Sequence, residues 1–105
     1  MNKSIIISYR ESTEERRNNL KYLLDYLSYI QDRNTEILII EQDDESKIDW
    51  LDEIRGKEYI KHIFIKNPGI FNKGWGYNIG SKLAESDILI FSDADLLNPK
   101  HIILL

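Results

Sequence analysis

The chain lacks several features that define common classes of protein. Its 105 residues include no cysteine, which excludes a disulfide framework and a thiolate metal site. Asp and Glu outnumber Lys and Arg by 18 to 14, so no broad basic surface is available and we expect no nucleic-acid partner. No apolar run approaches the roughly 20 residues of a membrane span, and residues 1–4 do not resemble a signal peptide. We therefore expect a cytoplasmic protein without a transmembrane segment.

Length and composition fit a single domain over residues 1–105. The chain is 42% apolar and 30% charged, which is typical of a globular protein with one core. Its last residues, His101–Leu105, are mostly apolar and have no polar tail. We expect either that the domain is truncated at its C-terminus, or that a partner chain, including a second copy, covers this end.

Hydrophobic spacing predicts alternating strands and helices. Short β-branched runs are typical of buried parallel strands, and apolar repeats at three and four residues are typical of amphipathic helices. Ser12 and Glu15 form a capping-box pattern before the longest helix. We predict strands at 4–8, 36–41, 62–66 and 88–91, and helices over about 13–32, around 48–54, and at 81–85. This alternation implies a three-layer α/β/α fold with a mostly parallel sheet and right-handed crossovers.

Two carboxylates, Asp93 and Asp95, follow the last predicted strand with one residue between them. The carboxyl ends of parallel strands form the edge where ligands bind, and paired hard oxygen ligands suit Mg²⁺ or Mn²⁺ carrying a diphosphate. These residues are therefore candidate metal ligands of a nucleotide-sugar site. The alternative is a polar loop that caps a following helix. His101 is either a third ligand or an incidental histidine.

A glycine-rich segment, residues 72–80, precedes the last predicted helix. Glycine lets a backbone approach a ligand closely, and the free amides at a helix N-terminus bind anions. Lys73 is accordingly a candidate contact to a diphosphate or a sugar. The alternative is that these glycines permit tight packing of the helix on the sheet, with Trp75 inserted in the core.

Four segments stand out together at or near the ends of the predicted strands. In chain order they are Ser8-Tyr9-Arg10, Glu41-Gln42-Asp43, Phe71–Gly80 and Phe91–Asp95. Together they resemble the N-terminal, nucleotide-binding half of GT-A fold glycosyltransferases, especially glycosyltransferase family 2 and the related galactosyltransferase-type enzymes. The resemblance implies a Rossmann-like domain that binds a nucleotide-sugar donor.

The resemblance also implies an activity. It is the transfer of a sugar from a nucleoside-diphosphate sugar, a UDP-sugar, to a hydroxyl of a glycan or another acceptor, with Mn²⁺ or Mg²⁺ as cofactor. In such enzymes the metal stabilises charge on the departing nucleoside diphosphate. A general base is expected beyond Leu105, so no catalytic residue is assigned among residues 1–105.

Several nucleotide contacts are implied by matching positions. Ser8, Tyr9 and Arg10 fall in the nucleotide site, with Tyr9 and Arg10 beside the base and ribose. Asn78, together with Gly80, matches the Asn-x-Gly of the family, whereas Tyr77 stands where many members carry Arg.

Carboxylates complete the implied site. Either Glu41 or Asp43 contacts the uracil edge, and both stay open because the chain departs from the common Asp-Asp-Gly-Ser pattern. Asp93 faces the ribose or donor sugar and holds the metal with Asp95.

Two other classes of function remain open. One is a binding module that keeps the fold and the pocket but lacks the acceptor half, and it predicts nucleotide-sugar binding without transfer. The other is an interaction unit in which the acidic loops are inert and the tyrosines at 22, 26 and 29, or the apolar end at 102–105, join a partner. Metal-dependent binding of UDP distinguishes the enzyme and the binding module from the interaction unit.

Overall fold

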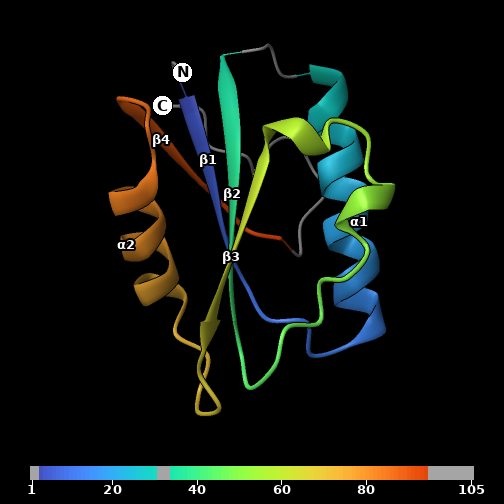
Figure 1. Ribbon diagram of the computed structural model, residues 1–105, viewed down its shortest axis with the longest axis vertical. Helices are drawn as coiled ribbons and strands as arrows, with labels where there is room; N and C mark the ends of the chain where they lie inside the picture. The colour runs from blue at the N-terminus through green and yellow to red at the C-terminus, as the bar shows by residue number, and fades with distance from the viewer. Residues whose placement is uncertain (1–2, 31–33, 95–105) are drawn as a thin grey trace.

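The computed structural model describes residues 3–30 and 34–94, which form one parallel sheet with a helix on each side (Figure 1). The four strands lie in the order β3-β2-β1-β4. In chain order the elements are β1 (Lys3–Tyr9), α1 (Glu14–Ile30), β2 (Thr35–Asp43), the 3₁₀ turns η1 (Leu51–Glu53) and η2 (Lys57–Tyr59), β3 (Ile60–Lys66), α2 (Lys73–Leu83) and β4 (Ile88–Ser92). The predicted three-layer α/β/α architecture with a parallel sheet is confirmed.

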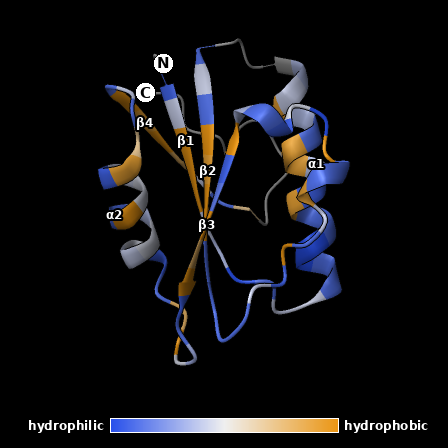
Figure 2. Ribbon diagram, viewed as in Figure 1, coloured by the Kyte–Doolittle hydropathy of each residue, from blue (hydrophilic) through white to orange (hydrophobic). Residues whose placement is uncertain are grey.

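The central strands β1 and β2 pair with their buried isoleucine and leucine positions side by side. Ile6 of β1 lies between Leu38 of β2 and Phe91 of β4, and Ile39 of β2 lies beside His62 of β3. Since β1 and β2 are central, both of their faces are covered, which explains their nearly continuous apolar sequence. Figure 2 shows this hydrophobic centre and the more polar outer surface of the helices.

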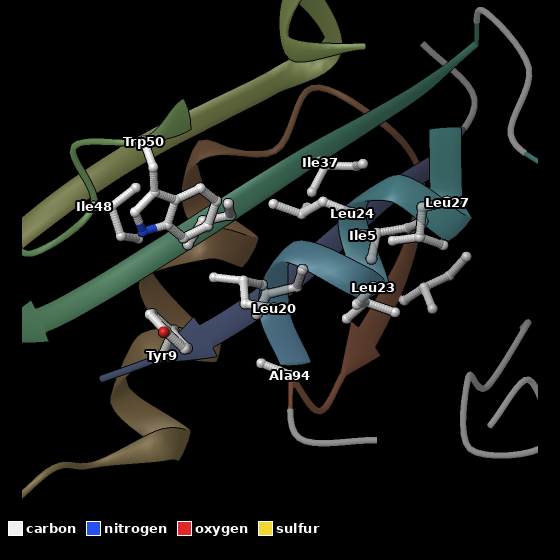
Figure 3. Packing of buried hydrophobic residues seen from close by; sticks show 13 residues of the cluster. Ile5, Tyr9, Leu20, Leu23, Leu24, Leu27, Ile37, Ile48, Trp50 and Ala94 are labelled. Atoms are coloured by element: carbon white, nitrogen blue, oxygen red, sulfur yellow. The ribbon is translucent and has the colours of Figure 1, made fainter. Parts of the chain in front are cut away.

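The larger part of the core lies between the sheet and α1. Helical spacing places four leucines of α1 against alternate residues of the central strands, and Ile48 and Trp50 close the cluster from the segment after β2 (Figure 3). Its members are Ile5, Ile7, Tyr9, Leu20, Leu23, Leu24, Leu27, Ile37, Ile39, Ile48, Trp50, Ile90 and Ala94.

On the other face, α2 packs close to the sheet because the residues of the helix that contact Ile6 and Ser8 are glycines. A Cβ atom built on Gly80 would lie 2.4 Å from Ile6 Cγ2, and one built on Gly76 would lie 2.0 Å from Ser8 Oγ. The alternative in which glycine permits tight packing of the helix is therefore correct at Gly76 and Gly80. Its second part, a Trp75 ring inserted in the core, is wrong, because Trp75 is 41% exposed.

Three predictions of local structure are corrected. Residues 72–80 are largely helical, because α2 begins at Lys73 and the sheet contact outweighs the low helix propensity of glycine. The helix predicted around 48–54 is replaced by the turns η1 and η2, separated by Gly56 at φ 79°. At the start of α1, Thr13 Oγ1 rather than Ser12 accepts a hydrogen bond, from the Arg16 amide, at 3.1 Å.

Candidate functional site

The C-terminal edge of the sheet gathers most of the polar residues predicted from the sequence. The ends of β2 and β3 and the starts of both helices lie together at the lower end of the view in Figure 1. This is the edge at which open parallel α/β sheets bind ligands. The side chains there divide into those that hold loops together and those that face solvent.

Lys73 and Asp93 are brought together from segments that are 20 residues apart. Lys73 is the first residue of α2 and Asp93 follows β4, and Lys73 Nζ lies 3.3 Å from Asp93 Oδ2. Both side chains are partly exposed. The pKa of Tyr77 is raised, mainly by burial and secondly by the negative charge of Asp93. Asp93 therefore interacts electrostatically with a second residue of α2.

The start of α2 is fixed by an asparagine cap. Asn72 Oδ1 accepts a hydrogen bond from the Trp75 amide at 2.9 Å, and the Asn72 carbonyl accepts one from Gly76 at 3.2 Å. The cap satisfies one of the free amides of the first turn. It also fixes the start of α2, from which the Lys73 side chain projects.

Glu41 is fully buried and both oxygens of its carboxylate accept hydrogen bonds. Oε1 accepts from Ser46 Oγ at 2.6 Å and contacts His62 Nε2 at 2.8 Å, and Oε2 accepts from the Lys47 amide at 2.8 Å. Burial raises the pKa of Glu41, but these hydrogen bonds outweigh burial and the net pKa is lowered. Glu41 therefore holds the loop after β2 against β3.

Asp43, the other candidate for the uracil edge, ends β2 and is nearer to solvent. Its Oδ2 accepts from Lys47 Nζ at 2.7 Å and its Oδ1 from the Asp44 amide at 2.9 Å. Burial raises its pKa, and the contacts with Lys47 and Asp44 outweigh burial and lower it. Asp43 is thus a carboxylate at the sheet edge with a lowered pKa, paired with the partly exposed side chain of Lys47.

The residues that end β1 differ in their accessibility. Tyr9 is fully buried in the core below α1, where burial and Glu11 raise the pKa of its phenol. Ser8 Oγ points toward α2 and has no hydrogen-bond partner among the described residues. Neither side chain lies on an open surface, so we do not include them among the side chains that contact a donor.

Arg10 binds three carbonyl groups. Nε donates to Gln42 O at 2.8 Å, Nη1 to Gly69 O at 2.8 Å and Nη2 to Asn67 O at 2.7 Å, and the guanidinium lies over the Phe71 ring. Its donors therefore connect the ends of β1 and β2 with the loop after β3.

The remaining predicted residues lie elsewhere. Asn78 is exposed and about one and a half turns further along α2 than Lys73. Asp95 and His101 lie outside the described residues, so the predicted metal pair is described only at Asp93.

Sequence reasoning missed two groups of residues at this edge. Gln42, Asn67 and Asn72 form a hydrogen-bonded cluster, for which the only sequence signals were the Asn-Pro-Gly turn at 67–69 and a polar residue within an apolar strand.

The second missed group surrounds a buried acid, Glu11. Its Oε1 accepts from Tyr9 Oη at 3.1 Å and Trp50 Nε1 at 3.2 Å, and its Oε2 accepts from Arg17 Nε at 2.7 Å. Glu11 lies beside a shallow hollow of about 460 Å³ between the start of α1 and the loop after β2. The lining residues are Glu11, Ser12, Thr13, Glu14, Arg17 and Lys47.

The described residues are compatible with a metal carried by a phosphate, but not with a metal cage made by protein alone. Among residues 3–30 and 34–94, no group of three or more His, Asp or Glu side chains is arranged to hold an ion. Mg²⁺ typically uses one or two carboxylates together with phosphate oxygens and water, and Asp93 supplies one such carboxylate at the sheet edge.

The family of the chain follows from comparison of its sequence. The sequence model described as "Glycosyl transferase family 2" matches residues 4–103, nearly the whole length. The chain belongs to glycosyl transferase family 2. No curated protein sequence matches it.

Comparison with solved structures agrees with the family. The crystal structure of S. aureus TarS is similar, with a TM-score of 0.70 and 19% sequence identity, over 90% of this chain and 17% of that one. At this identity the likeness bears on the fold, and it confirms the GT-A arrangement. The chain spans about a sixth of the length of the TarS chain that it matches.

None of the helices within the described ranges is both long enough and apolar enough to cross a membrane. The cytoplasmic location remains a prediction from the sequence.

Proposed function

We propose that this family 2 chain binds the donor of a metal-dependent glycosyltransferase that moves a sugar from a UDP-sugar to a hydroxyl acceptor. The observation that carries the proposal is the contact between Lys73 Nζ and Asp93 Oδ2 at 3.3 Å. It joins a cation at the start of α2 to a carboxylate at the end of β4, on the ligand-binding edge of the sheet.

Lys73 binds the diphosphate in this proposal. A phosphate at the first turn of α2 receives the positive end of the helix dipole and a charge-assisted hydrogen bond from the ammonium group. Asp93 would hold a divalent cation at this edge, and Mn²⁺ or Mg²⁺ there would stabilise negative charge on the departing nucleoside diphosphate.

Asp43 is the better supported of the two candidates for the uracil edge. Glu41 is fully buried and its oxygens bind its own loop and His62, whereas Asp43 is 6% exposed and one of its oxygens binds the partly exposed side chain of Lys47. A carboxylate accepts the N3–H of uracil, so Asp43 favours a uridine nucleotide.

The test is calorimetric titration of UDP into the full chain with and without Mn²⁺. We expect binding that depends on Mn²⁺ in the unmodified chain and a loss of that dependence in Asp93→Asn. In Lys73→Met the affinity for UDP should fall roughly tenfold or more, because a hydrogen bond to a charged group contributes about 1.5–3 kcal/mol.

Lys82→Met is the matched control, because Lys82 is an exposed lysine in the last turn of the same helix. It changes the net charge of the chain equally and should leave UDP affinity unaltered. Absence of UDP binding in both metal conditions would refute the proposal, as would equal losses in the Lys73 and Lys82 variants.

A further inference from the structure

A buried amide, that of Gln42, connects β2 to the segment that leads into α2. Nε2 donates to Asn72 O at 2.7 Å, while Oε1 accepts from the Asn72 amide at 3.2 Å and from Asn67 Nδ2 at 3.1 Å. The Gln42 side chain is fully buried, whereas Asn67 is partly buried and Asn72 is exposed. Both backbone polar groups of Asn72 are therefore bound by a single side chain.

The partners of Gln42 are themselves fixed. The Asn67 amide donates to Asp43 O at 2.8 Å, and Asn67 Oδ1 accepts from the Gly69 amide at 3.0 Å. Arg10 adds three bonds to carbonyls, one of which is Gln42 O. The cluster of Arg10, Gln42, Asn67 and Asn72 thus joins the ends of β1, β2 and β3 to the start of α2.

Asn72 is also the residue that immediately precedes Lys73. Its side chain caps α2, and the next residue carries the ammonium group that lies 3.3 Å from Asp93. A change in the position of Asn72 therefore moves both the helix amides and the origin of the lysine side chain.

We propose that Gln42 is a positioning residue for the donor diphosphate: through Asn72 it sets the place of the α2 N-terminus and of Lys73 over the sheet edge. This inference rests on the proposed function. Gln42 does not touch the ligand, and its effect is transmitted by Lys73.

Two features of the fold give Gln42 this role. The amide is on β2, a central strand paired on both sides, so its own position is rigid. The helix that it holds also contacts the sheet through glycine, and a Cβ on Gly76 would lie 3.0 Å from Gln42 Nε2. Tyr77, one turn after Lys73, stacks on Phe91 with 4.6 Å between the ring centroids, so this ring contact and the hydrogen bonds to Asn72 together define the position of the start of α2.

The experiment measures the dissociation constants of UDP and of uridine by NMR titration of the full chain in the presence of Mn²⁺. Gln42→Met keeps the length of the side chain and removes all three hydrogen bonds. Gln42→Glu keeps the acceptors for Asn67 and the Asn72 amide, replaces the donor to Asn72 O with a carboxylate oxygen, and adds one negative charge. A loss of affinity caused by that charge alone would persist unchanged in the absence of Lys73. The second variant carries the test if Gln42→Met does not fold, as judged by thermal unfolding.

We expect both variants to bind UDP roughly tenfold more weakly, about the loss of one charge-assisted contact, and to bind uridine as the unmodified chain does. In the background of Lys73→Met, Gln42→Glu should cause a smaller loss than in the unmodified chain, because part of its effect is transmitted by Lys73. Ser81→Ala is the control, since it removes a hydrogen bond to Tyr77 O within α2, away from its start, and should change neither affinity.

Equal weakening of UDP and uridine would overturn the inference, because it would indicate a general loss of structure. Additive losses in the double variant, or unchanged UDP affinity in both Gln42 variants, would overturn it as well. Failure of the proposed function would be seen separately, in the unmodified chain, as an absence of UDP binding.

Discussion

The face of the sheet below α1 and the face below α2 are stabilised in different ways. Among the residues that the structure describes, thirteen buried residues, largely leucine and isoleucine, form the cluster below α1. The described cluster below α2 has three buried members, Ile6, Leu38 and Ile40, and polar residues such as Gln42 and Ser8 lie on the same side of the strands.

The face below α1 therefore contributes mainly to the stability of the fold, and the face below α2 mainly to the position of α2. Apolar packing is non-directional and scales with the area removed from water, so the α1 face supplies most of the stabilising burial. Hydrogen bonds and close glycine contacts are directional and tolerate little displacement, so the α2 face determines where the start of α2 lies. The residues that we assign to the donor diphosphate, Lys73 and Asp93, lie on this second side.

The largest effect is expected from shortening a leucine below α1. Leu24 is fully buried in the large cluster, so Leu24→Ala should lower the free energy of unfolding by about 3 kcal/mol. Ile79→Ala on α2 should cost about half as much, because Ile79 is only partly buried. Urea unfolding of both variants measures the difference, and equal losses would contradict the proposed division between the two faces.

A smaller effect is expected from adding a single methyl group below α2. In Gly80→Ala the new Cβ lies 2.4 Å from Cγ2 of the buried, β-branched Ile6, so either the helix or the sheet must shift. Overpacking of about 1–3 kcal/mol is offset by the helix propensity of alanine, about 1 kcal/mol, which leaves a net loss of about 1 kcal/mol.

Gly74→Ala provides the matched control on the same helix. Its Cβ would lie 3.6 Å from Asn72 Oδ1, an ordinary contact, so the substitution should be neutral or slightly stabilising in thermal unfolding. If Gly80→Ala were equally well tolerated, the close approach of α2 would not be a requirement of the fold.

The smallest effect concerns two buried acids on opposite faces of β2. Glu36 accepts from Ser4 Oγ at 2.6 Å and from the Glu85 amide at 2.7 Å on the α2 side, and Glu41 contacts His62 and its loop on the α1 side. Burial raises the pKa of each, but hydrogen bonding outweighs burial, and both pKa values lie below the ordinary 4.5.

Protonation of these acids therefore favours the unfolded chain. The stability that each contributes is present above pH 4.5 and is lost as the pH falls through its lowered pKa in the folded state. We expect the free energy of unfolding to fall as the pH is lowered below 4.5, and to fall less steeply in Glu36→Gln and in Glu41→Gln. Denaturant unfolding at several pH values measures this slope, and an unchanged slope in both variants would contradict it.

Much of the fold could be predicted from local sequence patterns. The β-branched runs identified all four strands, and leucine spacing identified α1, because burial on two faces or on one helical face leaves a periodic pattern. The start of α2 could not be predicted in this way. Its three glycines indicate a loop by propensity, and only the contact with Ile6 and Ser8 explains why a helix forms there.

The candidate site was predicted in part. The structure brings Lys73 and Asp93 together, whereas the pairing of Asp93 with Asp95 lies outside the described residues. Glu41 and Arg10 were assigned to the nucleotide site from the resemblance to GT-A glycosyltransferases. In the structure their charged groups bind protein atoms instead.

By itself, the sequence determined the alternation of strands and helices, the parallel sheet, and the edge at which acidic and basic residues collect. These features follow from the spacing of residues that are near one another in the chain. Only the tertiary structure decided which polar side chains at that edge are engaged by the protein and which face solvent. Arg10 meets carbonyls 57 and 59 residues away, and Gln42 meets amide groups 25 and 30 residues away. Hydrogen bonds between such distant segments depend on the packing of the sheet, so no local pattern encodes them.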